Sequence, residues 1–219
     1  MKNDAKSTNS VFLQGTIGSS VEYSHDLYGE KFYEFKLNVP RLSEHLDIIP
    51  ITAAEPLAAE LKEGMAVSVV GQFRSFNRPD GERSRLILSV FAREIAAPYD
   101  GANPNVAELI GYICKPPVYR TTPFNREICD VLLAVNRAYS KSDYIPCIAW
   151  GKNARLIKNA PVGQKLEVTG RIQSRQYTKK QEDGSAEIRT AYEFSIGSAE
   201  FIKKETEVAS TSDTDEDDI

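Results

Sequence analysis

Residues 143–152, with the sequence Asp-Tyr-Ile-Pro-Cys-Ile-Ala-Trp-Gly-Lys, alternate between two kinds of side chain. Small or aliphatic residues occupy the odd-numbered positions from 145 to 149, whereas Tyr144, Ile148 and Trp150 lie at even-numbered positions. Because the side chains of a β-strand alternate between its two faces, this pattern predicts a half-buried strand. One face would pack in an interior. The aromatic face would contact either a second layer of protein or a ligand with flat groups.

This strand belongs to a segment that occurs twice in the chain. Gly15, Val39, Arg41, Asp47 and Pro50 all recur 96 residues later, and matches further along recur at offsets of 99 and then 106. The offset grows only in the predicted helix and in the loop between the last two strands, where insertions are tolerated. The sequence therefore predicts a tandem duplication.

Both copies have the same predicted order of elements, with a short helix between the third and fourth of five strands. The first copy has strands at 11–17, 33–39, 47–53, 66–73 and 85–91 and a helix at 55–63. The second copy has strands at 108–113, 127–135, 143–150, 165–172 and 188–196 and a helix at 153–159. This is the order of the OB-fold barrel, and neither a sandwich nor an SH3-like barrel predicts a helix at that point.

The predicted fold class is all-β, with two tandem five-stranded OB-fold barrels, each with a short helix between strands 3 and 4, and a disordered acidic C-terminal tail. Residues 98–105 are rich in proline, glycine and asparagine and predict a linker. Segments 77–81 and 182–184 predict hairpin turns. The expected divisions are a disordered N-terminus at 1–10, the first barrel at 11–97, the linker at 98–105, the second barrel at 106–204 and the tail at 205–219.

The net charge of −4 averages three different regions. Residues 1–104 carry 11 basic and 14 acidic residues, residues 105–204 carry 16 and 10, and residues 205–219 carry none and seven. The second copy is therefore basic and followed by an acidic tail, which favours a polyanionic partner for that copy.

The sequence offers little support for an enzyme. His25 and His45 are the only histidines, neither lies in a metal or triad spacing, and no glycine-rich phosphate loop occurs. We therefore expect no catalytic residues, no metal and no cofactor. Cys114, Cys129 and Cys147 lack metal-ligand spacing and are expected to be core residues in a reducing compartment. No apolar run approaches a membrane span, and no signal peptide is evident, so no membrane contact is expected.

Aromatic and basic residues gather in the second copy. Tyr139 follows its second strand, Tyr144 and Trp150 lie on its third strand, and Tyr177 begins the loop between its fourth and fifth strands. The surrounding basic residues are Arg120, Arg126, Arg137, Lys141, Lys152, Arg155, Arg171, Arg175, Lys179 and Lys180. Single-strand binding requires both kinds of residue, because cations track phosphates and unpaired bases stack on rings, at ~1–3 kcal/mol per base.

The alternative is that these aromatics are core or subunit-interface residues. The first copy provides a control, since Ser43, Ile48 and Ala54 stand where the second copy has its first three aromatics. A requirement of the fold would place aromatics in both copies. At these three positions only the basic copy has aromatics, which favours a ligand-binding role.

Residues 107–202 resemble the bacterial single-stranded DNA-binding protein (SSB) family. The similar segments are 109–111 (Leu-Ile-Gly), 145–154 (Ile-Pro-Cys-Ile-Ala-Trp-Gly-Lys-Asn-Ala) and 170–177 (Gly-Arg-Ile-Gln-Ser-Arg-Gln-Tyr). In that family, aromatics at the corresponding places stack on bases, so the resemblance implies this role for Tyr139, Tyr144, Trp150 and Tyr177. Tyrosines stand here where the family often has tryptophan. The first copy resembles the family loosely, and its candidates for contact with a strand are Arg74, Phe76 and Arg78.

The C-terminal residues 213–219 resemble the acidic tip through which SSB proteins recruit replication and repair partners. The residues assigned to this role are Asp215, Glu216, Asp217, Asp218 and Ile219. The family usually has a further Pro-Phe, which these residues lack. Two alternatives are a solubility tag and a pseudo-substrate that covers the basic face at low salt.

The resulting functional prediction is sequence-independent binding and protection of single-stranded DNA in replication, recombination or repair. SSB proteins commonly assemble four OB-folds, so the resemblance implies a homodimer in which the first barrel is mainly an assembly scaffold, and a cytoplasmic, nucleoid-associated location in a bacterium. One alternative is an OB-fold adaptor, similar to primosomal proteins, that mainly binds protein partners. Another is an RNA-binding OB module, because stacking does not by itself distinguish the two sugars.

Overall fold

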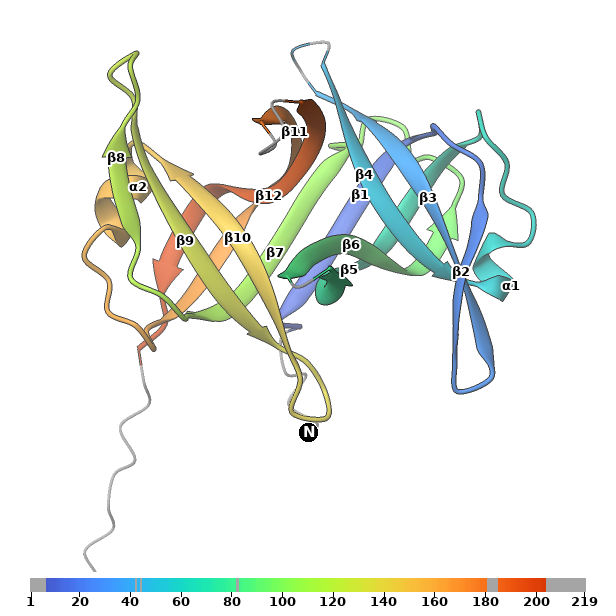
Figure 1. The fold of residues 1–219 in the computed structure, drawn as a ribbon, viewed down its shortest axis with the longest axis horizontal. Coiled ribbons are helices and arrows are strands. Elements are labelled where there is room, and N and C mark those ends of the chain that lie inside the picture. Colours follow the sequence, from blue (N-terminus) through green and yellow to red (C-terminus); the bar gives the residue numbers. More distant parts are fainter. Residues whose placement is uncertain (1–6, 42, 44, 82, 181–184, 204–219) are drawn as a thin grey trace, which may run out of the picture.

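The computed structural model describes residues 7–41, 43, 45–81, 83–180 and 185–203. Two β-barrels lie side by side, and their strands form one continuous 12-stranded sheet (Figure 1). The first barrel consists of β1 (Asn9–Ile17), β2 (Glu22–Leu27), β3 (Glu30–Pro40), β4 (Leu46–Ala54), α1 (Glu55–Ala58), β5 (Ala66–Asp80) and β6 (Arg83–Ala96). The second consists of β7 (Asn105–Ile113), β8 (Val118–Thr121), β9 (Glu127–Asn136), β10 (Ser142–Trp150), α2 (Lys152–Ile157), β11 (Lys165–Lys180) and β12 (Ala186–Phe201).

The two barrels close in the same way. The first strand of each barrel pairs antiparallel with two other strands of the same barrel, β1 with β3 and β5, and β7 with β9 and β11. A parallel pair, β4 with β6 and β10 with β12, completes each barrel. The two tandem OB-fold barrels predicted from the sequence are therefore confirmed.

The strand at Ser142–Trp150 differs from its predicted pattern at one residue. Ile145, Cys147 and Ala149 are buried as expected, and Tyr144 and Trp150 are exposed. Ile148 was expected on the outer face beside them but is only 6% exposed. It pairs with Asp130 on one side and Ser195 on the other, so it lies inside the sheet and not at an edge.

Each barrel has one strand more than the five predicted. β2 pairs with β3, and β8 pairs with β9. Both strands are short and exposed, so they lack the apolar alternation that marks a strand in a sequence. The helices are shorter than predicted, with α1 ending at Ala58 and α2 at Ile157. Neither described helix is long and apolar enough to cross a membrane.

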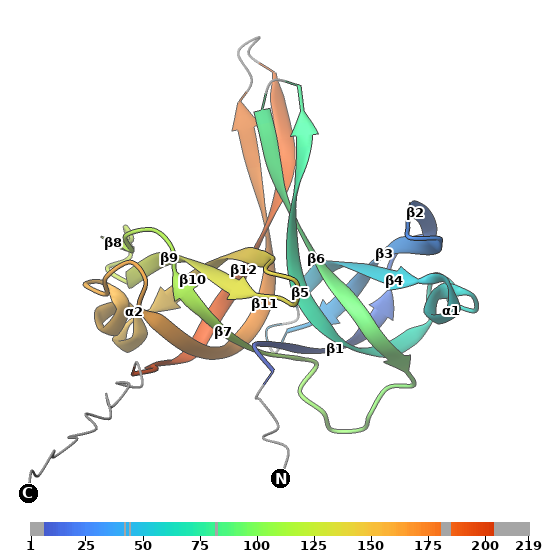
Figure 2. The same cartoon turned by 90° about the horizontal axis from the view of Figure 1, so that it is seen from below.

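Two long hairpins correct another expectation. Residues 77–81 were predicted as a turn, and Tyr177 at the start of a loop, but residues 77–80 and Tyr177 lie inside strands. Proline 79 is tolerated because this part of β5 is in a two-stranded ribbon. We call residues 74–80 with 83–89 the first arm, and residues 173–180 with 186–195 the second arm. Both arms project from the same side of the molecule (Figure 2).

The segments around the barrels also differ from the prediction. Asn9 and Ser10, expected in a disordered N-terminus, belong to β1 and pair with β7. The segment between β6 and β7 is held against β1, where the side-chain amide of Gln14 exchanges hydrogen bonds with the backbone of Tyr99 (2.8 and 3.1 Å). The 182–184 turn and the acidic tail lie outside the described residues.

Cysteine burial follows the prediction for two of the three residues. Cys129 and Cys147 are buried, Cys114 is partly buried, and all three are free thiols. Burial raises the pKa of each thiol, so all three stay protonated at neutral pH. These residues therefore act as small apolar side chains.

The duplication gives the molecule an approximate twofold arrangement. β1 and β7 pair antiparallel, from Asn9 opposite Leu109 to Leu13 opposite Asn105. In the first barrel, the buried Asn9 amide donates to the Phe73 carbonyl (2.7 Å) and accepts from the Phe73 N–H (2.9 Å). Asn105 makes the same pair of bonds to Ile172, at 2.7 and 3.0 Å. Equivalent asparagines therefore make the same pair of backbone hydrogen bonds in both copies.

Candidate nucleic-acid interface

A buried aspartate in the second barrel holds the first arm. Asp143 on β10 accepts a hydrogen bond from the Ser75 N–H, with an N–O distance of 2.6 Å. The Ser75 hydroxyl in turn accepts from the N–H of Tyr144, at 2.7 Å. We call this contact the Asp143–Ser75 brace. It fixes the backbone of a predicted stacking residue against the other barrel.

The mirror contact joins the same elements with the barrels exchanged. Asp47 on β4 accepts from the Ser174 N–H (2.7 Å), and the Ser174 hydroxyl accepts from the Ile48 N–H (2.9 Å). We call this contact the Asp47–Ser174 brace. The aspartates are 96 residues apart and the serines 99, so both braces descend from the same repeated positions.

Arginines accompany both braces. Arg137 lies 3.1 Å from the Asp143 carboxylate, and the Asp47 carboxylate pairs with Arg41 and, at 3.2 Å, with Arg171. Burial raises the pKa of Asp143, opposed by the Ser75 N–H and by Arg137, which lower it. Arg137 and Arg171 were predicted DNA contacts. The structure places both at the barrel junction, each with a carboxylate within 3.2 Å of its guanidinium group.

Three of the four predicted aromatics open onto one side of the second barrel. Tyr144 and Trp150 are 46% and 37% exposed on the same face of β10. Tyr177, on the second arm, is 39% exposed and lines a cleft of ≈ 360 Å³ together with Pro146, which lies between those two residues on β10. Tyr139 is 94% exposed in the β9–β10 loop, at the opposite end of β10 from Trp150.

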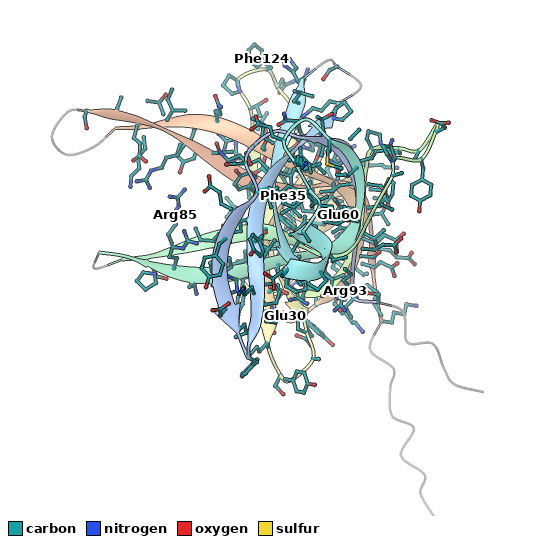
Figure 3. The ribbon with its side chains drawn as sticks, turned by 90° about the vertical axis from the view of Figure 1, so that its right-hand side faces the viewer. Glu30, Phe35, Glu60, Arg85, Arg93 and Phe124 are labelled. Atoms are coloured by element: carbon teal, nitrogen blue, oxygen red, sulfur yellow. The ribbon has the colours of Figure 1, made fainter. Side chains whose placement is uncertain are left out.

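The cleft that contains Tyr177 lies between the two arms. Arg85 from the first arm and Arg189 from the second arm both line this cleft. Figure 3 shows Arg85 in the space between the two arms. Arg85 also lowers the pKa of Glu187 on the second arm, although the Glu187–Arg189 hydrogen bond has the larger effect. Residues of both barrels therefore surround the Tyr177 ring.

The remaining predicted cations lie on the surface of the second barrel. Arg120 pairs with Asp130 at 2.9 Å, and Arg155 pairs with Glu127. Such exposed ion pairs are worth ~0–1 kcal/mol and exchange readily for phosphate contacts. The other predicted cations with exposed side chains, spread over the β8–β9 hairpin, the β9–β10 loop, α2 and the second arm, are Arg126, Lys141, Lys152, Arg175 and Lys179. Lys180 belongs to β11, and its side chain lies outside the described residues.

The structure adds candidates that the sequence analysis missed. Phe124 is 87% exposed at the tip of the β8–β9 hairpin (Figure 3). Hydrogen bonds between Thr122 and both Asn125 and Arg126 fix this turn. The Lys158 ammonium lies over the Tyr119 ring of the same hairpin, 5.2 Å from its centre. The available signal was an aromatic residue inside the polar run 121–126, Thr-Thr-Pro-Phe-Asn-Arg.

The interface has no candidate metal centre among the residues described, since no three His, Cys, Asp or Glu side chains are placed to hold an ion. Its chemistry consists of exposed rings, cations and hydrogen-bonding groups. Such a surface is suited to non-covalent binding of an anionic chain with flat groups.

A model of the single-strand binding protein family matches residues 104–202, which include the whole second barrel. This match confirms the resemblance to the SSB family predicted for the second copy. The matched family is one of binding proteins, which confirms the expectation of a non-enzymatic SSB domain. The first barrel lies outside the match.

Two curated relatives show the same limits. The chain is 37% identical over 84 residues to single-stranded DNA-binding protein 1 of Streptococcus pyogenes, and 36% identical over 84 residues to that of Lactococcus lactis. Each alignment covers 35% of this chain, and the chain spans 65% and 56% of the length of the two relatives.

A solved structure matches both barrels. The single-stranded DNA-binding protein from Thermus aquaticus aligns with a TM-score of 0.69 at 20% identity, covering 92% of this chain and 96% of that chain. At this identity the likeness concerns the fold. It extends the similarity from the SSB domain to the arrangement of two barrels in one chain.

Proposed function

We propose that this protein binds single-stranded DNA without sequence preference, through the outer face of its second barrel. The observation that carries the proposal is the exposure of Tyr144, Trp150 and Tyr177 toward one side of a basic barrel. Unpaired bases would stack on these rings, and phosphates would contact the cations around them. Duplex DNA keeps its bases stacked inside and offers no such faces.

The biological role that fits this binding is protection of single-stranded DNA during replication, recombination or repair. The family assignment of residues 104–202 and the names of the two curated relatives support this role. We further propose that two chains associate into a homodimer with four barrels, in the cytoplasm beside the nucleoid, and that residues 215–219 recruit replication or repair proteins.

The single tryptophan gives a direct test. Trp150 fluorescence is followed while the protein is titrated with oligo-dT, with oligo-rU and with duplex DNA, at low and at high salt. Quenching by oligo-dT that weakens with salt, as release of counterions requires, is the expected result. Binding without quenching would move the site away from β10. Preference for oligo-rU would favour the RNA-binding module, and no binding at all would favour the protein adaptor.

A further inference from the structure

The outer edge of β11 is held at three successive points as this strand leaves its own barrel. Gly170 is the last residue of β11 that pairs with β7, and Asn105 binds both backbone groups of Ile172. The third point is Ser174, where the partner changes from the second barrel to the first. Alternate residues of a strand present their backbone groups to the same edge, so these contacts form one line. The second arm therefore begins on its own barrel and continues on the other one.

The first barrel binds every polar group of Ser174. The Ser174 N–H donates to the Asp47 carboxylate at 2.7 Å, and the Ser174 hydroxyl accepts from the Ile48 N–H at 2.9 Å. The Ser174 carbonyl accepts from the Arg41 guanidinium at 3.1 Å. Three hydrogen bonds from one barrel thus fix both the backbone and the side chain of this residue.

The carboxylate that holds Ser174 is itself held in place. Asp47 is fully buried, and it also accepts from the Arg41 Nε at 2.7 Å and from Arg171 at 3.2 Å. Arg171 belongs to β11 and lies three residues before Ser174. A buried carboxylate with these partners is confined, because moving it would leave a buried charge unpaired. One side chain of the first barrel therefore holds β11 at two places.

The two faces of the second arm have different surroundings. Ser174 and Gln176 line a groove of ≈ 360 Å³ together with Ile48 and other residues of the first barrel. Because side chains alternate along a strand, Arg175 and Tyr177 lie on the opposite face of the arm. The contact on one face therefore determines where the Tyr177 ring stands on the other.

The first barrel also contributes to the cleft around this ring. Glu34 and Pro50 line the cleft together with Tyr177, Arg85 and Arg189. The cleft thus has two guanidinium groups for one carboxylate. A shift of the second arm over the first barrel would move the Tyr177 ring relative to this charged lining.

We infer that the first barrel is a positioning element of the single-strand site, in which Asp47 holds Ser174 and thereby sets the position of the Tyr177 ring. The inference rests on the proposed function. Asp47 and Ser174 act through the second arm and need no contact with the strand. The role expected for the first barrel changes from assembly scaffold to part of the site, although the family match does not include it.

The physical reason is the cost of ordering the arm. A strand that stacks on Trp150 and on Tyr177 together requires a fixed spacing between the two rings. An arm that moved freely would lose that freedom each time a strand bound, and the lost entropy would lower the affinity. An arm that is already held by the first barrel avoids this cost.

The test is a double-mutant cycle between the Asp47–Ser174 brace and the ring. Asp47→Ala and the milder Ser174→Ala are each combined with Tyr177→Ala. The matched controls are Asp143→Ala and Ser75→Ala, which change the equivalent brace on the first arm. Anisotropy of labelled oligo-dT of ~16 nucleotides, the upper site size of one OB-fold, gives affinity. Trp150 quenching reports on β10, and thermal unfolding verifies that each variant is folded at the assay temperature.

Asp47→Ala should weaken binding about fivefold, as Tyr177→Ala does, and the double variant should bind about as weakly as Tyr177→Ala alone. Once the ring is absent, its position has no effect. Ser174→Ala keeps the backbone bond to Asp47, so a loss of about twofold is expected, again only when the ring is present. Any losses in the two controls should multiply with that of Tyr177→Ala, and Trp150 quenching should persist in every variant.

Wild-type affinity in Asp47→Ala, or a loss that multiplies with that of Tyr177→Ala, would overturn the inference. Weaker binding by Tyr177→Ala would in that case still support the proposed function. Wild-type affinity in Tyr177→Ala would also overturn the inference, since no ring contact would remain to be positioned. If Asp47→Ala does not fold, Ser174→Ala decides by the same criteria. A wild-type protein that binds no oligo-dT would instead overturn the proposed function.

Discussion

Ile48 and Tyr144 occupy the same position in the two barrels and have the same backbone environment. Each donates its N–H to a serine hydroxyl of the opposite arm, and each follows a buried aspartate that holds that arm. Only the side chains differ. The backbone contacts are those that the paired barrels require, so they are retained in both copies. The side chain that faces outward is free to differ, and there the copies have separated into an aliphatic and an aromatic surface.

The largest effect is expected from breaking the two braces one at a time. Asp143→Ala and Asp47→Ala should each lower the free energy of unfolding by about 3 kcal/mol, because each leaves a serine N–H without its partner and removes a buried anion beside an arginine. Chemical denaturation of both variants measures this. Similar losses would establish that the braces are equivalent, and a large loss in only one of them would contradict the symmetry.

Next in size is the loss of a stacking ring. Trp150→Ala and Tyr177→Ala should each weaken oligo-dT binding by at least about fivefold, since a stacked base contributes ~1–3 kcal/mol. Anisotropy with labelled oligo-dT measures both, because Trp150→Ala removes the intrinsic fluorophore. Wild-type affinity in both variants would exclude base stacking on this face.

The comparison of Tyr144 with Ile48 can be made directly. Tyr144→Ala should weaken oligo-dT binding about fivefold, at the lower end of the range for a stacked base, because this ring lies at the barrel junction. Ile48→Ala should change the affinity less than about twofold. Both substitutions leave the backbone N–H of the brace in place, so stability should change little in either. Equal losses of affinity would show that both barrels contact the strand at this position.

The smallest effect is expected at a single surface cation. Arg175→Gln should weaken binding to every DNA sequence by a similar factor and should reduce the salt slope by ~1. Stability should stay within about 0.5 kcal/mol of the wild type, because the residue is exposed. An unchanged slope would remove Arg175 from the phosphate path.

The two-barrel fold could be predicted because the duplication provides two separate sequence patterns for each element. The alternation around Ile145 and the strand around Ile49 indicate the same strand independently, and both are buried as expected. The exposed strands β2 and β8 could not be predicted, because their backbone pairing with β3 and β9 leaves no apolar pattern in the sequence. The arms were missed since turn-forming residues such as Pro79 are tolerated in a two-stranded ribbon.

The candidate site could be predicted only in part, for a related reason. Tyr144 and Trp150 lie on a strand whose alternation assigns them to the outside, and both are exposed there. Arg171 could not be distinguished from a surface cation, because its carboxylate partner Asp47 belongs to the other copy. Arg137 pairs with Asp143, which is close to it in the same copy. The repetition of Arg41 and Asp47 as Arg137 and Asp143 was visible. The structure gives the reason for this repetition, because each aspartate holds the arm of the opposite barrel.

The antiparallel pairing of β1 with β7 has a consequence for how this chain can evolve. Joined on one polypeptide, the two barrels meet at an effective concentration of the order of millimolar, so their pairing does not loosen on dilution. In a dimer of identical single barrels, every substitution would occur twice, on both sides of the twofold axis. In this chain each barrel is encoded separately, so a substitution changes one barrel only. A tyrosine can arise opposite an isoleucine, and one half of the pair can change its ligand without altering the other.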